Sequence, residues 1–498
     1  MMTVIFTYPI LEPEMSTQPV RTLAGETTSG YARERQRYWD EFAGSFERWQ
    51  LVRGFYQGRL AELYRFLVPP GMRVLELGCA RGDLLATLRP ERGVGVDLSP
   101  VFVECARRKY PQLEFRCGDA HHLDLGETFD YIICSDLVND LWDVQRVCER
   151  IAAHSKPETR VILNFYSRVW ELPRRLSEAL GLVKRQLPQN WLTADDLAHL
   201  LYLANFEVIR TSREVLCPLY VPLLGQLINR CLVKLWPCNL LALTNFLVAR
   251  PQPRPVPGPE PVVSVIVPAR NEEGNIRQIF DRVPQMGAGT ELIFVEGNSK
   301  DDTYGAIQRE IPCHPNVNAR LLKQPGKGKG DAVRTGFANA TGQLLMILDA
   351  DLTVAPEDLP RFYSAWRTGK AEFVNGVRLV YPMEERAMRF FNHIANRFFS
   401  WAFTWLLGQS IKDTLCGTKV LGKSQYEMIA ANRAYFGELD PFGDFDLLFG
   451  AAHYNMKMVD LPIRYRERTY GETNIQRWRH GALLLKMLLL ASRKLKFI

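Results

Sequence analysis

The chain has 498 residues, of which 47% are hydrophobic and 23% are charged, and its formal net charge is +7. This composition excludes a disordered chain, and the length predicts two or three domains rather than a single core. The charge is modest for this size and no compact nucleic-acid-binding motif is present, which argues against a nucleic-acid partner. The cysteines are scattered without a Cys-x-x-Cys pair, which predicts reduced thiols and no structural zinc site.

Residues 1–28 are expected to form a loose tail. No basic region precedes the apolar residues 4–6, and glutamates follow soon after, which argues against a signal peptide. A first domain is expected over residues 29–215. It opens with helical sequence around residues 38–43 and continues into a short apolar strand at residues 73–77.

A glycine turn and an apolar-periodic helix follow this first strand. Gly78 and Gly82 allow the backbone to turn tightly and to approach a ligand closely. Three further strands are predicted, and each is followed by an aspartate: Asp97, Asp119 and Asp136. An acid after the second strand can hydrogen-bond a ribose diol. The alternation of strands and helices predicts an α/β fold with an open parallel sheet and with ligands at the carboxyl ends of the strands.

This ordered series resembles the class I S-adenosylmethionine-dependent methyltransferases over roughly residues 30–215. The resemblance implies a Rossmann-like sheet whose S-adenosylmethionine-binding residues are Glu76, Gly78, Gly82, Asp97 and Asp119. In the family the turn holds the methionine moiety, the acid at Asp97 binds the ribose, and the acid at Asp119 contacts the adenine. Ala80 stands where the middle glycine of the turn usually lies. A sheet for another cofactor, or one that has lost binding, remains the alternative.

The methylation target is not readable from the sequence. Methyl transfer needs an aligned nucleophile and sometimes a base, and polar residues near the predicted strand ends offer candidates. They are His121, His122, Asn139, Asp140, Asn164 and Tyr166. For each one alone, a packing or loop role is the simpler interpretation, and none is singled out as a base.

An apolar helical segment is expected over residues 216–249. Its apolar residues recur at near-helical spacing, with Asn229, Arg230 and Lys234 opposite, and prolines interrupt it too often for a membrane span. Two interpretations stay open: a flap over the first domain, or a helix lying on a membrane or on the second domain. The proline-rich residues 250–261 then predict an extended, fairly stiff linker.

A second domain is expected over residues 262–480. Two buried strands, each followed by a polar loop, lead to a glycine- and lysine-rich turn at residues 326–330. Backbone N–H groups and basic side chains of such a turn bind phosphate oxygens. A later buried strand ends in Asp349 and Asp351, which are placed to bind one hard divalent cation. The alternative is a surface loop beside an aspartate-rich turn.

These motifs resemble, in order, the inverting GT-A glycosyltransferases of family 2, and among them the dolichyl- and polyprenyl-phosphate sugar synthases. The resemblance implies a nucleotide-sugar donor bound by Pro268, Asn271, Glu272, Glu296, Lys329, Arg334 and Asp349. Asp349 and Asp351 would hold Mg²⁺ or Mn²⁺ on the donor diphosphate, and Asp351 is counted as catalytic. Glu296 and Gly297 replace two aspartates that are common in relatives, so UDP and GDP donors both remain open.

Three later motifs concern the acceptor. Asp413 opens a stretch that resembles the family's D-x-x-C-G motif, where donor and acceptor meet. Asp444 and Asp446 resemble an acidic motif that often supplies a base; we rank Asp444 first, although helix capping explains both as well. A phosphate acceptor is already ionised near neutral pH and needs little help from a base, so orienting the acceptor and binding metal are the alternative roles of Asp444. Arg468 opens a segment similar to R-x-x-G-x-S and is the expected phosphate contact.

Two stretches suggest lipid: the aromatic-rich residues 389–407 and an amphipathic basic helix over residues 481–498. Ordinary core helices are the alternative. We therefore expect a bifunctional enzyme, cytoplasmic and peripheral on the inner face of the membrane. It would transfer a sugar to a polyprenyl phosphate or glycolipid, and a methyl group to an unidentified target. The competing hypothesis is a transferase for a soluble saccharide acceptor, with the first domain as a non-catalytic docking scaffold.

Overall fold

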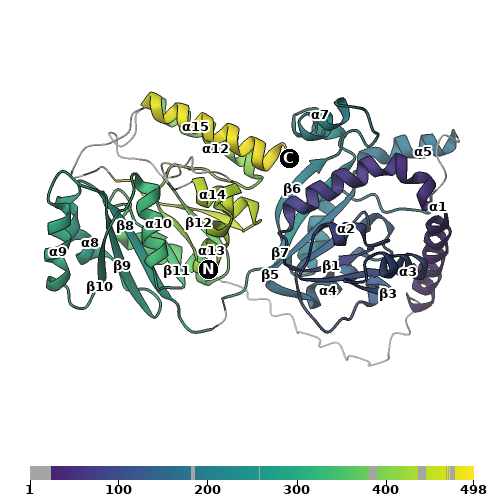
Figure 1. Ribbon diagram of the computed structural model, residues 1–498, viewed down its shortest axis with the longest axis horizontal. Helices are drawn as coiled ribbons and strands as arrows, with labels where there is room; N and C mark the ends of the chain where they lie inside the picture. The colour runs from purple at the N-terminus through teal and green to yellow at the C-terminus, as the bar shows by residue number, and fades with distance from the viewer. Residues whose placement is uncertain are drawn as a thin grey trace, which may run out of the picture.

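The computed structural model describes residues 24–180, 186–256, 258–378, 380, 390–435, 443, 445–466, 468, 470 and 477–498. Within these ranges the side chains of residues 24–29, 44–53, 390–396 and 477–480 are not described. The chain folds around two seven-stranded sheets, one in each half, with helices on both sheets (Figure 1). The predicted α/β fold class is confirmed.

The first sheet has the strand order β3-β2-β1-β4-β5-β7-β6. Its strands are β1 (Arg73–Leu77), β2 (Arg92–Asp97), β3 (Glu114–Cys117), β4 (Phe129–Ser135), β5 (Ser155–Tyr166), β6 (Phe206–Glu214) and β7 (Thr244–Pro251). The first five are parallel, as expected, but β7 is antiparallel to both β5 and β6. The sheet is therefore mixed, and its parallel part carries the strand ends at which ligands were predicted.

The helices of the first half are α1 (Ala24–Leu67), α2 (Asp83–Thr87), α3 (Pro100–Lys109), α4 (Val144–Ala153), α5 (Glu171–Ala179), α6 (Ala194–Leu203) and α7 (Leu224–Arg230). Short polar side chains fix several starts: Ser99 accepts from the Phe102 N–H before α3, and Asp143 caps α4. The expected tail lies outside the described residues up to residue 23, while residues 24–28 already belong to α1.

The expectation of a helical segment over residues 216–249 needs correction. Helical turns end at Leu241, in α7, η4 (Leu232–Lys234) and η5 (Cys238–Leu241), and β7 then enters the sheet between β5 and the edge strand β6. β7 is buried along nearly its whole length, and such a strand reads as a continuous apolar run. Periodicity alone does not distinguish a short run of that kind from a buried helix.

The second sheet has the order β10-β9-β8-β11-β13-β12-β14. Its strands are β8 (Val262–Ala269), β9 (Gly289–Glu296), β10 (Asn318–Lys323), β11 (Leu344–Ile347), β12 (Phe373–Val377), β13 (Lys419–Gly422) and β14 (Met458–Pro462). Its helices are α8 (Ile276–Arg282), α9 (Thr303–Cys313), α10 (Lys329–Asn339), α11 (Leu359–Arg367), α12 (Phe390–Leu407), α13 (Lys423–Ala431), α14 (Phe445–His453) and α15 (Arg477–Ala491), the last continuing into a π-helical turn, η9 (Ser492–Lys496). Among the helices of the described residues, none is both long and apolar enough to cross a bilayer.

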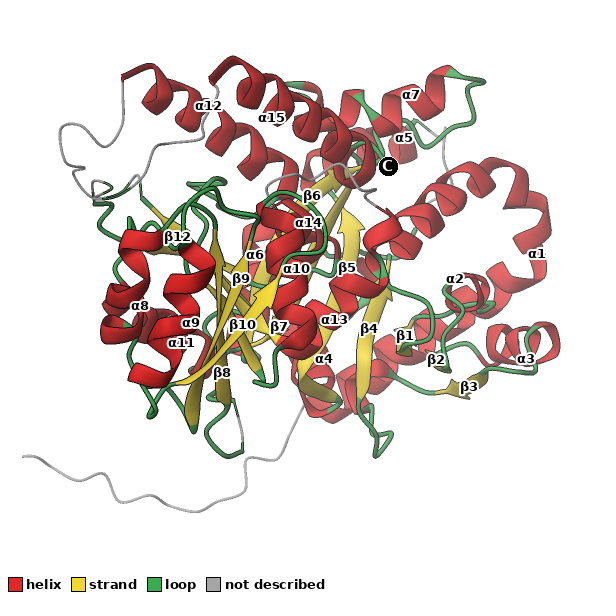
Figure 2. Ribbon diagram, turned by 60° about the vertical axis from the view of Figure 1, so that its left-hand side comes forward, coloured by secondary structure: helices red, strands yellow, loops and turns green. Residues whose placement is uncertain are grey.

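A buried ion cluster joins the two halves. Arg160 of β5 donates to both oxygens of Glu372 at 2.7 Å, and Arg250 of β7 lies 3.4 Å from the same carboxylate. Burial acts to raise the pKa of Glu372, but Arg160 and Arg250 outweigh burial and lower it. One cluster of buried apolar residues also runs through both halves, which lie against each other in Figure 2. The interface is therefore both apolar and ion-paired.

Candidate active sites

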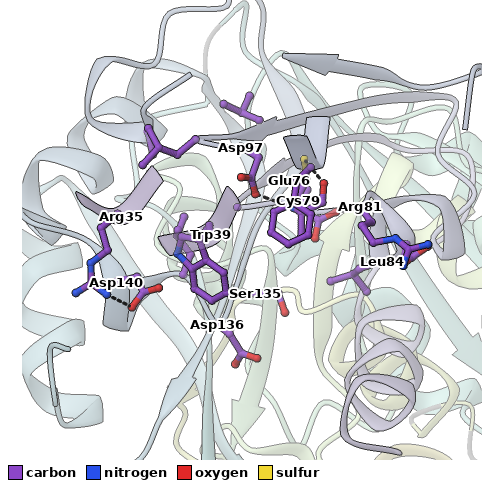
Figure 3. A pocket seen from close by; sticks show the side chains of 18 of the residues that line it. Arg35, Trp39, Glu76, Cys79, Arg81, Leu84, Asp97, Ser135, Asp136 and Asp140 are labelled. Carbon is purple, nitrogen blue, oxygen red and sulfur yellow. Dashed lines mark hydrogen bonds and ion pairs between the residues drawn. The ribbon is translucent and has the colours of Figure 1, made fainter. Parts of the chain in front are cut away.

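A cavity of about 530 Å³ lies at the carboxyl ends of β1, β2 and β4, and α1 forms another of its walls. This is the size of an ordinary small-molecule site. All five residues predicted to bind the methyl-donor cofactor lie at it: four line the cavity, and Gly82 lies between the lining residues Arg81 and Asp83. Figure 3 shows how side chains from the sheet and from α1 surround the space.

The glycine turn after β1 is shaped by left-handed backbone. Gly78 and Gly82 have φ of 72°, and Ala80 between them has φ of 43°. A Cβ at Gly82 would lie 2.5 Å from the Phe115 ring, so only glycine fits there. Ala80 adopts a conformation that glycine would adopt with less strain, which explains the preference for glycine at this position in the family it resembles.

Asp97 connects this turn to the next strand. Its Oδ2 accepts from the Ala80 N–H at 2.7 Å, and its Oδ1 accepts from the Ser99 N–H at 2.9 Å. Burial raises the pKa of Asp97, and these backbone hydrogen bonds act in the opposite direction. The carboxylate thus lies fixed at the cavity wall, where a ribose diol would meet it.

Glu76 and Asp119 are held in different ways. Glu76 is buried, and its Oε2 accepts from the Leu85 N–H at 3.0 Å, while burial raises its pKa well above the usual range. Burial also acts to raise the pKa of Asp119, but hydrogen bonds from His121 outweigh it and lower the pKa. Asp119 Oδ1 lies 2.6 Å from His121 Nδ1. His121, one of the candidates for a base in methyl transfer, therefore orients Asp119.

No sequence motif predicts that α1 forms a wall of the cavity. Arg35 of α1 donates to Asp140 Oδ1 at 2.9 Å in a buried ion pair, and Trp39 lies beside it (Figure 3). Tyr56 of α1 donates to Asp136 Oδ1 at 2.8 Å, and Asn164 donates to the same oxygen at 2.5 Å. Aromatic residues in an otherwise polar helix were the one available hint.

The second site lies where β11 ends. Lys329 Nζ lies 2.5 Å from Asp349 Oδ1, and Arg468 Nη2 donates to Asp351 Oδ2 at 2.7 Å. Thr353 fixes the other oxygen of Asp351 through its N–H at 3.1 Å and its hydroxyl at 2.7 Å. Burial acts to raise the pKa of Asp351, but Arg468 outweighs it and lowers the pKa. Four predicted residues from distant positions therefore meet here.

Glu272 extends this charged group. Its Oε1 lies 3.6 Å from Arg468 Nη1, and its Oε2 accepts from Asn275 at 2.8 Å. Burial raises the pKa of Glu272 to about 7, although Arg468 acts to lower it. A carboxyl group with such a pKa beside other charged side chains is typical of functional sites.

The other predicted donor residues fix the loops after β8 and β9. Asn271 has φ of 57°, receives a hydrogen bond from the Lys300 N–H on its side chain at 2.7 Å, and donates its own N–H to Ser299. Glu296 accepts from the Ser299 N–H at 2.6 Å. Pro268 is the β8 residue opposite Val295 of β9. These residues lock the two loops together.

The D-x-x-C-G stretch, which was predicted to contact the acceptor, has one end at the carboxylates and the other end buried in the protein. A Cβ at Gly417 would collide with Asp349 and Lys329, so the D-x-x-C-G stretch reaches the carboxylates. Asp413 is buried and receives hydrogen bonds from Arg378 at 2.7 and 2.9 Å. It therefore shapes this stretch from within the protein.

The remaining predicted residues lie around α10 and α14. Arg334, expected near the diphosphate, lies 3.6 Å from Asp446, whose pKa is raised by burial. Asp444 lies outside the described residues. Its neighbour Gly443 packs directly on Gly330 of the glycine- and lysine-rich turn.

A divalent cation is compatible with this chemistry. The described residues include no group of three or more histidine, cysteine or acidic side chains arranged around a metal position. Asp349 and Asp351 nevertheless supply a pair of carboxylates, and each attracts a cationic side chain. Mg²⁺ is often bound by one or two carboxylates, with phosphate oxygens and water as the other ligands. The pair fits a cation that arrives with a diphosphate.

Comparisons with known proteins agree with these two sites. Residues 52–211 match the family profile described as a methyltransferase domain, and residues 264–432 match glycosyl transferase family 2. The dolichol-phosphate mannosyltransferase of Pyrococcus furiosus is 28% identical over 221 residues, which are 43% of this chain and 59% of that protein. The Saccharomyces cerevisiae dolichol-phosphate mannosyltransferase is 37% identical over 108 residues, or 20% of this chain and 40% of that protein.

A third relative carries a different sugar specificity. The undecaprenyl-phosphate 4-deoxy-4-formamido-L-arabinose transferase of Edwardsiella ictaluri is 26% identical over 217 residues, which are 42% of this chain and 62% of that protein. The chain thus spans between 40% and 62% of the length of these relatives. The predicted combination is confirmed: the chain is an enzyme with a methyltransferase domain followed by a family 2 glycosyltransferase domain.

Proposed function

We propose that the glycosyltransferase domain transfers a hexose-type sugar, with inversion, from a nucleotide-sugar donor to a polyprenyl phosphate or a related lipid. The observation that carries this proposal is the meeting of Asp349, Asp351, Lys329 and Arg468 at one strand end. Carboxylates for a cation and basic groups for phosphates are what a diphosphate donor requires. The similarity to transferases whose names specify dolichol phosphate or undecaprenyl phosphate supports the lipid acceptor.

The proposed reaction is a single displacement at the anomeric carbon. An acceptor phosphate oxygen forms the new bond, while the bond to the diphosphate breaks and the nucleoside diphosphate leaves with the electron pair. Asp349 and Asp351 would hold Mg²⁺ or Mn²⁺, which when bound would neutralise the charge that develops on the leaving diphosphate. Lys329 and Arg468 bind phosphate oxygens, and Asp444 orients the acceptor.

The donor nucleoside lies, in this proposal, against the loops after β8 and β9. These loops are fixed by Asn271 and Glu296, and Glu272 connects them to Arg468. Pro268 and Arg334 complete the proposed donor site, and Asp413 positions the acceptor stretch through Arg378.

The methyltransferase domain, in this proposal, uses S-adenosylmethionine. The cavity at β1, β2 and β4 has the volume for it, and Asp97 and Asp119 lie at the wall where the ribose and adenine would bind. Both activities would take place on a protein that is cytoplasmic and peripheral on the inner face of the membrane.

The direct test is an incubation of the purified protein with labelled nucleotide sugars, Mg²⁺ or Mn²⁺, and polyprenyl phosphate in detergent. A labelled product that extracts into organic solvent is the expected result, and it identifies donor and acceptor class together. Donor hydrolysis without lipid product would move the acceptor to a saccharide or a protein. Lack of any donor turnover would refute the proposed transfer.

An Asp97→Asn substitution is expected to weaken S-adenosylmethionine binding. Asparagine keeps the size of the side chain but loses a charged acceptor, and hydrogen bonds to charged groups contribute about 1.5–3 kcal/mol, or roughly tenfold to a hundredfold in affinity. Isothermal titration calorimetry measures the change. Asp124→Asn, on the exposed loop before β4, is the matched control and should bind like the wild type. Equal affinity of both variants would contradict the role of Asp97.

A further inference from the structure

The chain between β6 and β7 has an inverted pattern of burial. In residues 216–241, which we call the β6–β7 segment, Asn229 is 1% exposed and Lys234 is 8% exposed. Asn229 accepts from the Leu216 and Cys217 N–H groups at 2.8 Å and donates to the Cys217 carbonyl at 2.7 Å. Lys234 forms a buried ion pair with Glu214. These polar side chains anchor the segment to the protein.

Most of the large apolar side chains of the β6–β7 segment are exposed instead, although Val233 is buried. Leu223 is 88% exposed and Trp236 is 80% exposed. The other large exposed apolar residues of the segment are Leu219, Tyr220, Val221, Leu224, Leu227, Leu232, Leu235, Leu240 and Leu241. Leu223 also has φ of 60°, a strained conformation for leucine that keeps it at the tip of the loop. The exposed apolar residues favour the second of the two interpretations left open from the sequence, in which the segment lies on a membrane.

Neighbouring helices continue this surface. Leu172, Leu176 and Leu180, on α5 and at its end, are each more than 60% exposed. In the second domain, Phe398 and Trp401 of α12 and Leu485 and Leu489 of α15 are also exposed. Figures 1 and 2 place α5, α7, α12 and α15 at the same upper end of the molecule in both views. Exposed apolar residues gathered at one end of a molecule are typical of an interaction site.

Three of the stretches that contribute to this surface carry only positive charge. The sequence has no aspartate or glutamate in residues 215–243, 390–407 or 477–498. Exposed basic residues in these stretches include Arg397, Lys486 and Arg493. Anionic headgroups attract Lys and Arg side chains that lie near the membrane surface. Exposed tryptophan and tyrosine, as at Trp236 and Tyr220, favour the boundary between headgroups and acyl chains.

We propose that the β6–β7 segment and α5 of the methyltransferase domain dock on an anionic lipid bilayer, in one plane with α12 and α15. This inference rests on the proposed lipid-linked function and extends it, because it makes the methyltransferase domain a membrane-binding part of the enzyme. The leucines and Trp236 enter the interface, while Asn229 and Lys234 hold the segment from the protein side. A lipid surface matches the observed combination of exposed leucine, exposed tryptophan and basic residues in stretches that contain no acidic residue.

The test is flotation of the full-length protein with vesicles of phosphatidylcholine, with and without phosphatidylglycerol, in the absence of donor. We expect binding that increases with the anionic lipid. The triple variant Leu223→Ser, Leu224→Ser, Trp236→Ser should bind about tenfold or more weakly, because apolar area is lost from the interface. Val101→Ser with Met428→Ser, exposed apolar residues on α3 and α13, is the matched control and should bind normally.

A second variant tests the charge. Lys486→Glu with Arg493→Glu should reduce binding to anionic vesicles and leave the weaker binding to neutral vesicles unchanged. Unchanged vesicle binding of the triple variant would overturn the proposal. The proposal would also be overturned if the wild-type protein did not bind vesicles but self-associated through this surface. In that case the mass in solution would be lower for the triple variant than for the wild type. Sugar transfer to polyprenyl phosphate in detergent micelles is measured separately, so failure to bind vesicles is distinguished from failure of the proposed reaction.

Discussion

An Asp351→Asn substitution is expected to reduce sugar transfer by about three orders of magnitude, because metal charge stabilisation supplies several kcal/mol of the barrier reduction and each 1.36 kcal/mol is tenfold. Asparagine keeps the contact with Thr353 but removes the negative charge that a cation and Arg468 both require. Initial rates with a labelled donor and saturating acceptor measure the effect.

The control for this substitution is Asp281→Asn. Asp281 carries the same charge but lies on α8, half-exposed and beside His314. This variant should retain normal activity. An Asp351→Asn enzyme within severalfold of wild-type activity would show that the carboxylate pair does not hold the reaction's cation. Raising the Mg²⁺ or Mn²⁺ concentration should recover part of the lost rate, which a purely structural defect would not allow.

A Glu372→Gln substitution is expected to destabilise the folded protein by about 3–5 kcal/mol, the typical cost of removing one partner from a buried ion pair. The variant would leave Arg160 buried at the domain interface without its carboxylate, and Arg250 would keep only its ion pair with Glu207. Chemical denaturation at neutral pH measures the free energy of unfolding. Glu158→Gln, an exposed glutamate near Arg160 on β5, is the matched control and should change it little.

The pH dependence gives a second readout of the same group. The pKa of Glu372 is lowered in the folded protein, below an unfolded value of about 4.3. Its contribution is therefore fully present above about pH 4.3 and is lost as the pH falls through the folded-state pKa. The stability difference between the wild type and Glu372→Gln should shrink under acid conditions. A difference that stays constant with pH would mean that the charge of Glu372 is not what stabilises the interface.

The parts of the two sites that the sequence predicted are local ones. Asp97 lies at the end of a buried strand, and Asp349 and Asp351 lie just after another. The end of the strand therefore determines where these carboxylates lie. The α/β fold class predicted from these local patterns is confirmed by the two sheets, and the two predicted families are confirmed by the matching family profiles. The individual roles of the site residues stay predictions.

What the sequence did not predict depends on contacts between distant residues. Arg35 and Asp140 are 105 positions apart, and nothing in either local pattern specifies their ion pair. β7 was mistaken for helix because its place between β5 and β6 is decided by the sheet and not by its own periodicity. The exposure of the leucines in the β6–β7 segment likewise depends on the buried contacts of Asn229 with Cys217 and of Lys234 with Glu214.

The interface between the two halves implies that the enzyme melts as one cooperative unit. A proline-rich linker normally suggests two domains that unfold independently. Here Val256 of the linker donates its N–H to Arg367, and the shared apolar cluster and the Glu372 ion cluster cross the boundary. Differential scanning calorimetry should show a single transition with equal calorimetric and van't Hoff enthalpies. The two catalytic activities would then be lost together on heating, and neither domain would serve as a stable fragment without the other.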